Sequence, residues 1–290
     1  MNLLRCHRQA VSISLLLLII WSGSSRAHVG VDSSIERYNA LINDQPDQSE
    51  LYLKRGELHR ENRHWQLAWA DYQQAQRLAA TPGQQQEILF CMGRMQLQAG
   101  RPEQASPLLE QVLQQNPDYI RARLNLARTY LALNRPGQAV EQMDRYIVLL
   151  KRPSPDFYLE RAQMAQALGP DGYAQLVQGL DDGVNALGPI VTLLGKLIEV
   201  HLEQGDTEKA LTRFEQLSPL LKSLPTWQAK KGDIHRAAGD QRAAERSYEQ
   251  ALQALRQLPA GRRSTRAMQD LESDLCARLK NCSEERKTRP

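Results

Sequence analysis

The sequence predicts an all-α protein, an α-solenoid of about six helix pairs with a capping helix at each end. A ladder of small residues recurs along the chain, and successive ladders begin 34 to 37 residues apart. In five of the six pairs, a glycine or asparagine stands where the first helix is expected to end. The composition is rich in Gln, Leu, Ala and Arg and includes only three Phe, which favours helices over strands.

Each ladder starts on a first helix with a residue that we call position 0, and continues on the second helix with an alanine twelve residues later. Small side chains let two helices cross closely, and the residues four and seven after the alanine share its stripe. We expect that stripe to pack against the neighbouring pair. The position 0 residues are Gly56, Gly93, Ala127, Ala162, Ile198 and Gly232, and the alanines are Ala68, Ala105, Ala139, Ala174, Ala210 and Ala244.

The expected turns follow seven residues after position 0, where Gly and Asn tolerate the left-handed conformation that ends a helix. These residues are Gly100, Asn134, Gly169, Gly205 and Gly239. The spacing therefore predicts where five first helices stop.

This pattern resembles the tetratricopeptide repeat, whose unit is about 34 residues long. The clearest match is residues 89–117, with Gly93, Gly100, Ala105 and Pro117 in the positions that the family uses. The resemblance covers about residues 33–258 and implies a right-handed superhelix with a concave groove lined mainly by the first helices. We expect a leading helix in residues 28–48, repeats 1–3 in 49–153, repeat 4 in 154–190, repeats 5 and 6 in 191–259, and a capping helix with a basic tail in 260–290.

Repeat 4 departs from the ladder, because Gln178 and Asp181 stand where apolar residues are expected. An apolar stripe persists, shifted by about one residue, at Tyr173, Leu176, Leu180, Val184 and Leu187. Two interpretations stay open: a degenerate repeat with a kinked helix, or a hinge that changes the curvature of the array.

Residues 1–27 have the pattern of a cleavable export signal. Arg5 and Arg8 precede an apolar run of eleven residues, and small residues at Ser25 and Ala27 mark a cleavage site. The run is shorter than the roughly 20 residues that span a bilayer, so we expect cleavage near Ala27 and no stable membrane span afterwards. An uncleaved interfacial anchor is the alternative, and the expected location is the bacterial periplasm.

The expected mature chain is almost neutral, because 34 basic and 33 acidic residues stay after Arg5, Arg8 and Arg26 are removed. This balance argues against a nucleic-acid partner, which needs clustered positive charge. Cys276 and Cys282 are six residues apart and can pair if the last helix ends between them; Cys91 lies in an apolar helix pattern and is expected to be a buried thiol.

No catalytic or nucleotide-binding motif occurs, and we expect neither an enzyme nor a cofactor. His59, His201 and His235 each lie three residues after position 0 of a different repeat. Residues spread in this way are expected to pack in the core, and no group of residues has the spacing of metal ligands.

The candidate site is therefore the groove, and its partner is a protein or an extended peptide. By the resemblance, the first helices display Leu53, Glu57, Phe90, Arg94, Leu97, Arg121, Leu124, Asn125 and Arg128. Leucine beside arginine suits an apolar peptide that carries an acidic group, although the leucines could instead pack against a neighbouring helix. Only Asn125 fits the clamp by which some family members hold a terminal carboxylate, so we do not expect that clamp.

Two other functions stay open. The protein could be a structural or assembly factor that acts by self-association, or an accessory subunit that presents a substrate to an exported enzyme.

Overall fold

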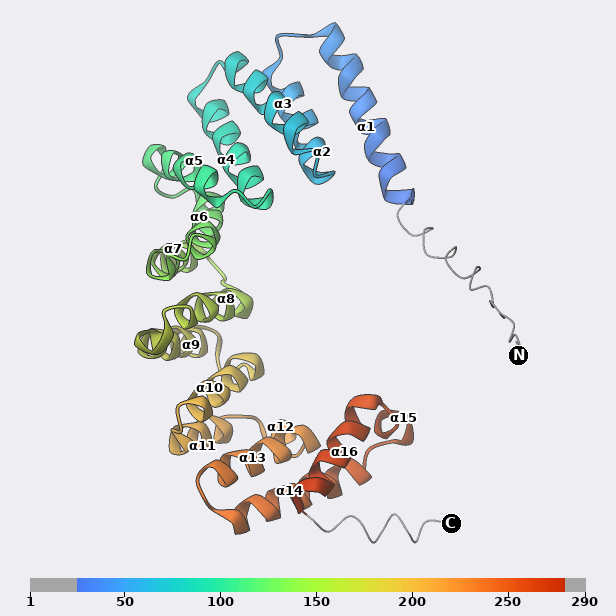
Figure 1. Ribbon diagram of the computed structural model, residues 1–290, viewed down its shortest axis with the longest axis vertical. Coiled ribbons are helices and arrows are strands. Elements are labelled where there is room, and N and C mark those ends of the chain that lie inside the picture. Colours follow the sequence, from blue (N-terminus) through green and yellow to red (C-terminus); the bar gives the residue numbers. More distant parts are fainter. Residues whose placement is uncertain (1–24, 280–290) are drawn as a thin grey trace, which may run out of the picture. The chain divides into compact units, whose positions relative to one another are not determined.

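The computed structural model describes the backbone of residues 25–279 and the side chains of residues 33–279. These residues form helices joined by short turns, and no strand occurs among them (Figure 1). The predicted all-α class is confirmed. None of the described helices is both long and apolar enough to cross a membrane.

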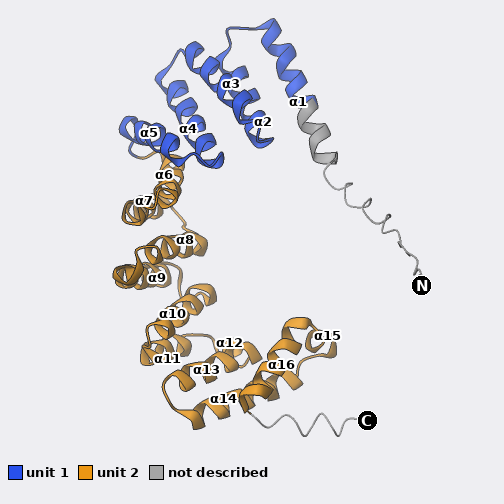
Figure 2. Cartoon of the chain, viewed as in Figure 1, with its two compact units in different colours: residues 1–117 blue, residues 118–290 orange. Residues whose placement is uncertain are grey.

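The chain divides into two compact units, residues 1–117 and 118–290 (Figure 2). The N-terminal unit holds α1 (Ser25–Asp44), α2 (Ser49–Glu61), α3 (Trp65–Leu78), α4 (Pro82–Gln98) and α5 (Pro102–Gln115). The C-terminal unit holds α6 (Ile120–Ala132), α7 (Pro136–Leu149), α8 (Pro155–Gln166), the 3₁₀ helix η1 (Gly169–Gly172), α9 (Tyr173–Leu187), α10 (Val191–Glu203), α11 (Thr207–Glu215), α12 (Pro219–Lys222), α13 (Pro225–Ala237), α14 (Gln241–Arg256), α15 (Ala260–Arg263) and α16 (Arg266–Leu279).

Consecutive helices pack as pairs, and the pairs coincide with the predicted repeats. Repeats 1 and 2 are α2/α3 and α4/α5 in the N-terminal unit. Repeats 3 to 6 are α6/α7, α8/α9, α10/α11 and α13/α14 in the C-terminal unit. The boundary between the units follows Pro117 and lies outside repeat 4.

The ladder alanines lie at the crossings of the helix pairs. Ala68, Ala105, Ala139, Ala210 and Ala244 are each 0% exposed. The glycines at position 0 touch the residue four places beyond the alanine: a Cβ on Gly56 would lie 2.8 Å from the Tyr72 ring, and one on Gly93 would lie 2.8 Å from Leu109. The absent side chains thus allow close packing of each pair.

The predicted turns are also confirmed. The five residues have φ values between 56° and 79°, in the left-handed region: Gly100, Asn134, Gly169, Gly205 and Gly239. Repeat 1 uses Arg63 at the equivalent place, with a φ of 59°.

Repeat 4 keeps a ladder, but its register differs from the prediction. Ala174 is exposed, so its expected place at the crossing is wrong. Leu176, Leu180 and Gly183 are buried with the usual spacing of four and seven residues, a shift of two residues. The extra two residues lie in the 3₁₀ turn η1, between α8 and α9.

In repeat 4 the small and the bulky residues at the helix crossing have also exchanged helices. Glycines now lie on the second helix and bulky residues on the first: a Cβ on Gly183 would lie 2.8 Å from the Tyr158 ring, and one on Gly179 would overlap the Arg161 side chain. The α9 helix runs unbroken from Tyr173 to Leu187. Whether repeat 4 bends the array stays a prediction.

The ends of the described chain differ slightly from expectation. The leading helix α1 starts at Ser25, two residues before the predicted cleavage site at Ala27, and the rest of the export signal lies outside the described residues. At the other end, Leu275 of α16 is 0% exposed and packs with Ala244, Tyr248 and Ala251, so α16 caps the last repeat. Cys276 is disulfide-bonded, but Cys282 lies outside the described residues, so their pairing stays a prediction.

Candidate binding surface

The predicted groove residues of the N-terminal unit lie on α2 and α4. Leu53 and Leu97 are half-buried. Phe90 is 1% exposed, and the Arg94 guanidinium lies 5.1 Å from the centroid of its ring. The expectation that Phe90 is displayed to a partner is therefore wrong, because the ring contributes its large apolar surface to the core.

Glu57 and Arg94, also expected in the groove, form an ion pair with each other. Tyr72 Oη donates a hydrogen bond to Glu57 Oε1 at 2.5 Å, and Arg60 Nη2 lies 3.2 Å from Oε2. Burial raises the pKa of the Glu57 carboxyl, but these contacts outweigh burial and the net pKa is lowered. The two charges therefore compensate each other.

The other predicted groove residues lie on α6 in the C-terminal unit. Arg128 donates from Nε and Nη2 to the two carboxylate oxygens of Glu160 on α8, at 2.6 and 3.0 Å. Asn125 Nδ2 donates to the backbone oxygen of Arg121 at 2.7 Å, Leu124 is half-buried and Arg121 is exposed. Like Arg94, Arg128 already binds a carboxylate of its own chain.

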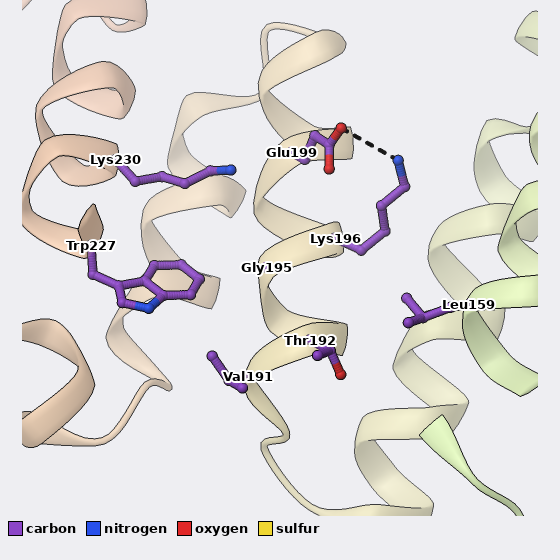
Figure 3. Close-up of a pocket in the computed structure, with 8 residues that line it drawn as sticks. All are labelled: Leu159, Val191, Thr192, Gly195, Lys196, Glu199, Trp227 and Lys230. Carbon is purple, nitrogen blue, oxygen red and sulfur yellow. Dashed lines mark ion pairs between the residues drawn. The ribbon is translucent and has the colours of Figure 1, made fainter. Parts of the chain in front are cut away.

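A hollow of about 410 Å³ lies farther along the first helices, in repeats 4 to 6. Its volume falls in the range of roughly 300–1,000 Å³ that is usual for ligand sites. It is lined by residues of α8, α10 and α13, drawn in Figure 3: Leu159, Val191, Thr192, Gly195, Lys196, Glu199, Trp227 and Lys230.

Gly195 lines the hollow and adds no side chain to it. The residue three places before position 0 is large in the first four repeats, as Leu53, Phe90, Leu124 and Leu159, but is Gly195 in the fifth. Leu159 and the Trp227 ring point toward α10 from opposite sides (Figure 3). A Cβ on Gly195 would lie 3.4 Å from Cη2 of Trp227, so a larger side chain would enter the space between them.

Two lysines stand at the rim of the hollow, each two places before position 0. Lys196 Nζ lies 3.5 Å from Glu199 Oε1. Lys230 extends toward α10 and forms no ion pair with any residue of the described chain (Figure 3). The hollow thus combines apolar walls with two positive charges and one negative charge.

The three histidines at equivalent repeat positions are buried or half-buried, in agreement with the packing role that their spacing predicts. His59 and His201 are 9% and 1% exposed, and His235 is half-buried. His201 Nδ1 lies 2.9 Å from Tyr173 Oη, and burial lowers the pKa of its imidazole. Within residues 33–279, no group of three or more His, Cys, Asp or Glu side chains is placed to hold a metal ion.

Cys91 also agrees with its prediction. It is a free thiol, 2% exposed, and burial raises its pKa. A buried protonated thiol is unreactive toward electrophiles.

The groove residues predicted from the sequence belong to repeats 1 to 3, whereas the residues of the hollow belong to repeats 4 to 6. A signal for them exists in the sequence: a glycine inside a helix costs about 1 kcal/mol relative to alanine, so Gly195 needs a local reason. Lysine at the same position of two successive repeats is a second signal.

Two segments of the chain match family profiles described as tetratricopeptide repeat, residues 96–148 and 193–216. No curated protein matches the sequence significantly.

Among solved structures, the C-terminal part of a TPR repeat-containing protein from Cytophaga hutchinsonii aligns over 84% of this chain and 95% of that chain, with a TM-score of 0.63 and 12% identity. A tetratricopeptide repeat protein from Parabacteroides merdae aligns over 86% and 93% of the two chains, with a TM-score of 0.49 and 16% identity. YrrB, a TPR protein with an unusual peptide-binding site, aligns over 74% and 99%, with a TM-score of 0.49 and 13% identity. At these identities the similarity concerns the fold alone.

The first matched segment runs from the end of α4 through α5, α6 and most of α7, and the second covers most of α10 and all of α11. Both segments contain helices and turns that the ladder predicts. The chain therefore contains tetratricopeptide repeats, and its described residues have an all-α fold of the helical solenoid type.

Proposed function

We propose that the protein is a non-catalytic scaffold that binds another protein, or an extended segment of one, through the first helices of its C-terminal unit. The hollow on α8, α10 and α13 is the observation that supports this function. Its apolar walls come from three successive repeats, and cations at its rim can orient a bound chain. A tetratricopeptide-repeat fold is consistent with a binding role, because stacked helix pairs create extended surfaces.

Site-specific photo-crosslinking in the native cell tests this function. The photoreactive residue p-benzoylphenylalanine replaces Thr192, which lines the hollow on α10. The matched control replaces Thr212, which is exposed on α11, the second helix of the same repeat. We expect a discrete protein adduct from position 192 and none from position 212. The same adduct from both positions, or none from either, would show that this face does not bind a partner.

We also propose that the protein acts in the cell envelope after export. The basic lead, short apolar run and small residues of positions 1–27 support this location. The mass of the protein recovered from the periplasmic fraction tests it. Loss of about 27 residues is expected, whereas a full-length protein confined to the cytoplasm would contradict export.

A further inference from the structure

We propose that the hollow recognises an extended acidic segment of a partner protein, seating one large apolar side chain between Trp227 and Leu159 and pairing a nearby carboxylate with Lys230. This inference rests on the proposed function and specifies the chemistry of the bound segment.

The apolar part of the hollow accommodates one large side chain. Its apolar lining comes from the side chains of Trp227, Leu159 and Val191. Gly195 has no side chain that would fill the space between them. A side chain that enters this space occupies the place taken in repeats 1 to 4 by the protein's own Leu or Phe. Burial of a leucine or phenylalanine side chain away from water is favourable enough to anchor a segment.

The positive charge of Lys230 beside the apolar part of the hollow favours an acidic residue in the bound segment. Trp227 and Lys230 are three residues apart on α13, so they share a face and lie about 4.5 Å apart along its axis. Residues of an extended chain are spaced by roughly 3.3 Å. A carboxylate one or two residues from the anchoring side chain therefore comes within reach of Lys230, which has no partner among the described residues.

Glu199 limits the number of acids that the hollow accepts. Its side chain is 48% exposed and lies 3.5 Å from Lys196, a weak pair that a second carboxylate could displace only against the repulsion of Glu199. Removal of the Glu199 charge should therefore strengthen binding of an acidic segment.

The chain's own terminal segments do not have this chemistry. Residues 1–24 carry Arg5 and Arg8 and no acidic residue. Residues 283–290 contain Glu284 and Glu285 but no large apolar side chain. We therefore assign the complementary segment to a partner protein, in line with the proposed function.

Fluorescence anisotropy with labelled twelve-residue peptides tests the inference. The first peptide carries a central Phe followed by Asp and Glu in an otherwise Ser/Gln/Ala sequence. The second replaces both acids by Lys, and the third replaces Phe by Ala. We expect the first peptide to bind at least about tenfold more tightly than either of the others, because each loses one of the two contacts.

Four variants locate the peptide on the protein. Gly195→Leu fills the apolar part of the hollow and should weaken binding by about tenfold or more. Lys230→Glu should weaken it about fivefold, and Glu199→Gln should strengthen it about twofold to fivefold. Arg242→Glu is the matched control: it makes the same charge change at an exposed site on the second helix α14 and should leave the affinity unchanged.

The outcomes separate this inference from the proposed function. If Thr192 yields a partner adduct but the acidic and basic peptides bind equally, the inference is wrong and the binding function stands. A preference for the acidic peptide that survives both Gly195→Leu and Lys230→Glu also overturns the inference, because the segment then binds elsewhere. An adduct with twice the mass of the protein identifies a second copy as the occupant, and likewise overturns it.

Discussion

Arg63 ends the first helix of repeat 1 in the left-handed conformation, with a φ of 59°. The other five repeats use Gly or Asn there, and a side chain in this region costs about 1–2 kcal/mol. Arg63 is exposed and forms no ion pair in the described part of the chain, so its side chain does not offset this cost.

We therefore expect Arg63→Gly to raise the free energy of unfolding by about 0.5–1 kcal/mol, after the added flexibility of the unfolded chain is subtracted. Urea titration measures the change. The reciprocal substitution Gly100→Arg, at the equivalent turn of repeat 2, should destabilise the protein by about 1 kcal/mol. Destabilisation by Arg63→Gly would contradict the left-handed conformation at this turn.

Gly232 allows Tyr248 to pack against α13. A Cβ on Gly232 would overlap the ring, which is 2% exposed and is held by a hydrogen bond from Tyr248 Oη to Asp233 Oδ1 at 2.9 Å. Gly232→Ala should therefore lower the free energy of unfolding by about 1–3 kcal/mol, although alanine is the better helix former. The control Gly83→Ala, where a Cβ would meet nothing within 4 Å, should be neutral or stabilising by urea titration.

His201 links the stability of the C-terminal unit to pH. Burial lowers the pKa of its imidazole, and the nearby Arg213 adds to this effect, so the folded state holds the neutral form. The unfolded histidine titrates near pH 6.5. Stability is thus fully present above that pH and falls as the pH decreases toward the lowered pKa, by up to about 1.4 kcal/mol per pH unit.

His201→Gln removes this titration, so the free energy of unfolding should vary less between pH 7 and pH 5 than in the unmodified protein. Denaturant titrations at several pH values measure the slope. An unaltered slope in His201→Gln would mean that His201 is not held neutral.

At the scale of the helix, repeat 4 shows how a turn sets the register of the element that follows. The 3₁₀ turn η1 adds two residues, so Leu176 rather than Ala174 reaches the crossing with α8. Leu176→Ala should cost about 2–5 kcal/mol of stability, because it opens a cavity beside a helix pair. Ala174→Glu, at an exposed position, should change stability by less than about 0.5 kcal/mol. A larger loss of stability from Ala174→Glu than from Leu176→Ala in urea titration would contradict this register and support the one predicted from the sequence.

At the scale of the whole molecule, the repeat ladder predicts the helix pairs well because burial at a crossing depends on local spacing. Residues of the same kind as Gly56, Ala68 and Tyr72 recur at the same spacing where two helices cross closely. The sequence therefore shows directly where each crossing lies. The inserted turn η1 shifts the spacing between the two helices of repeat 4. Its length cannot be predicted from the sequence, because a glycine-rich loop can span the same gap with different numbers of residues.

The binding surface is less predictable, since it depends on side chains from different helices. The ion pair of Glu57 with Arg94 and that of Arg128 with Glu160 join residues 37 and 32 positions apart, and neither follows from the spacing of one helix. The hollow likewise needs Gly195, Trp227 and Leu159 from three helices at once. The position of a residue in its repeat therefore predicts which face of the helix it lies on. The side chains of neighbouring helices then determine whether that residue is free to contact a partner.

The yield of the photo-crosslinked adduct at position 192, compared between the unmodified protein and the Gly195→Leu variant in the native cell, tests the central claim most directly. Leucine at position 195 is compatible with α10, since it replaces glycine inside a helix, but it fills the hollow next to Trp227. We expect the partner adduct to disappear in the variant while its helicity and urea midpoint are kept. An undiminished adduct in a folded Gly195→Leu variant would contradict the claim that this hollow holds the partner.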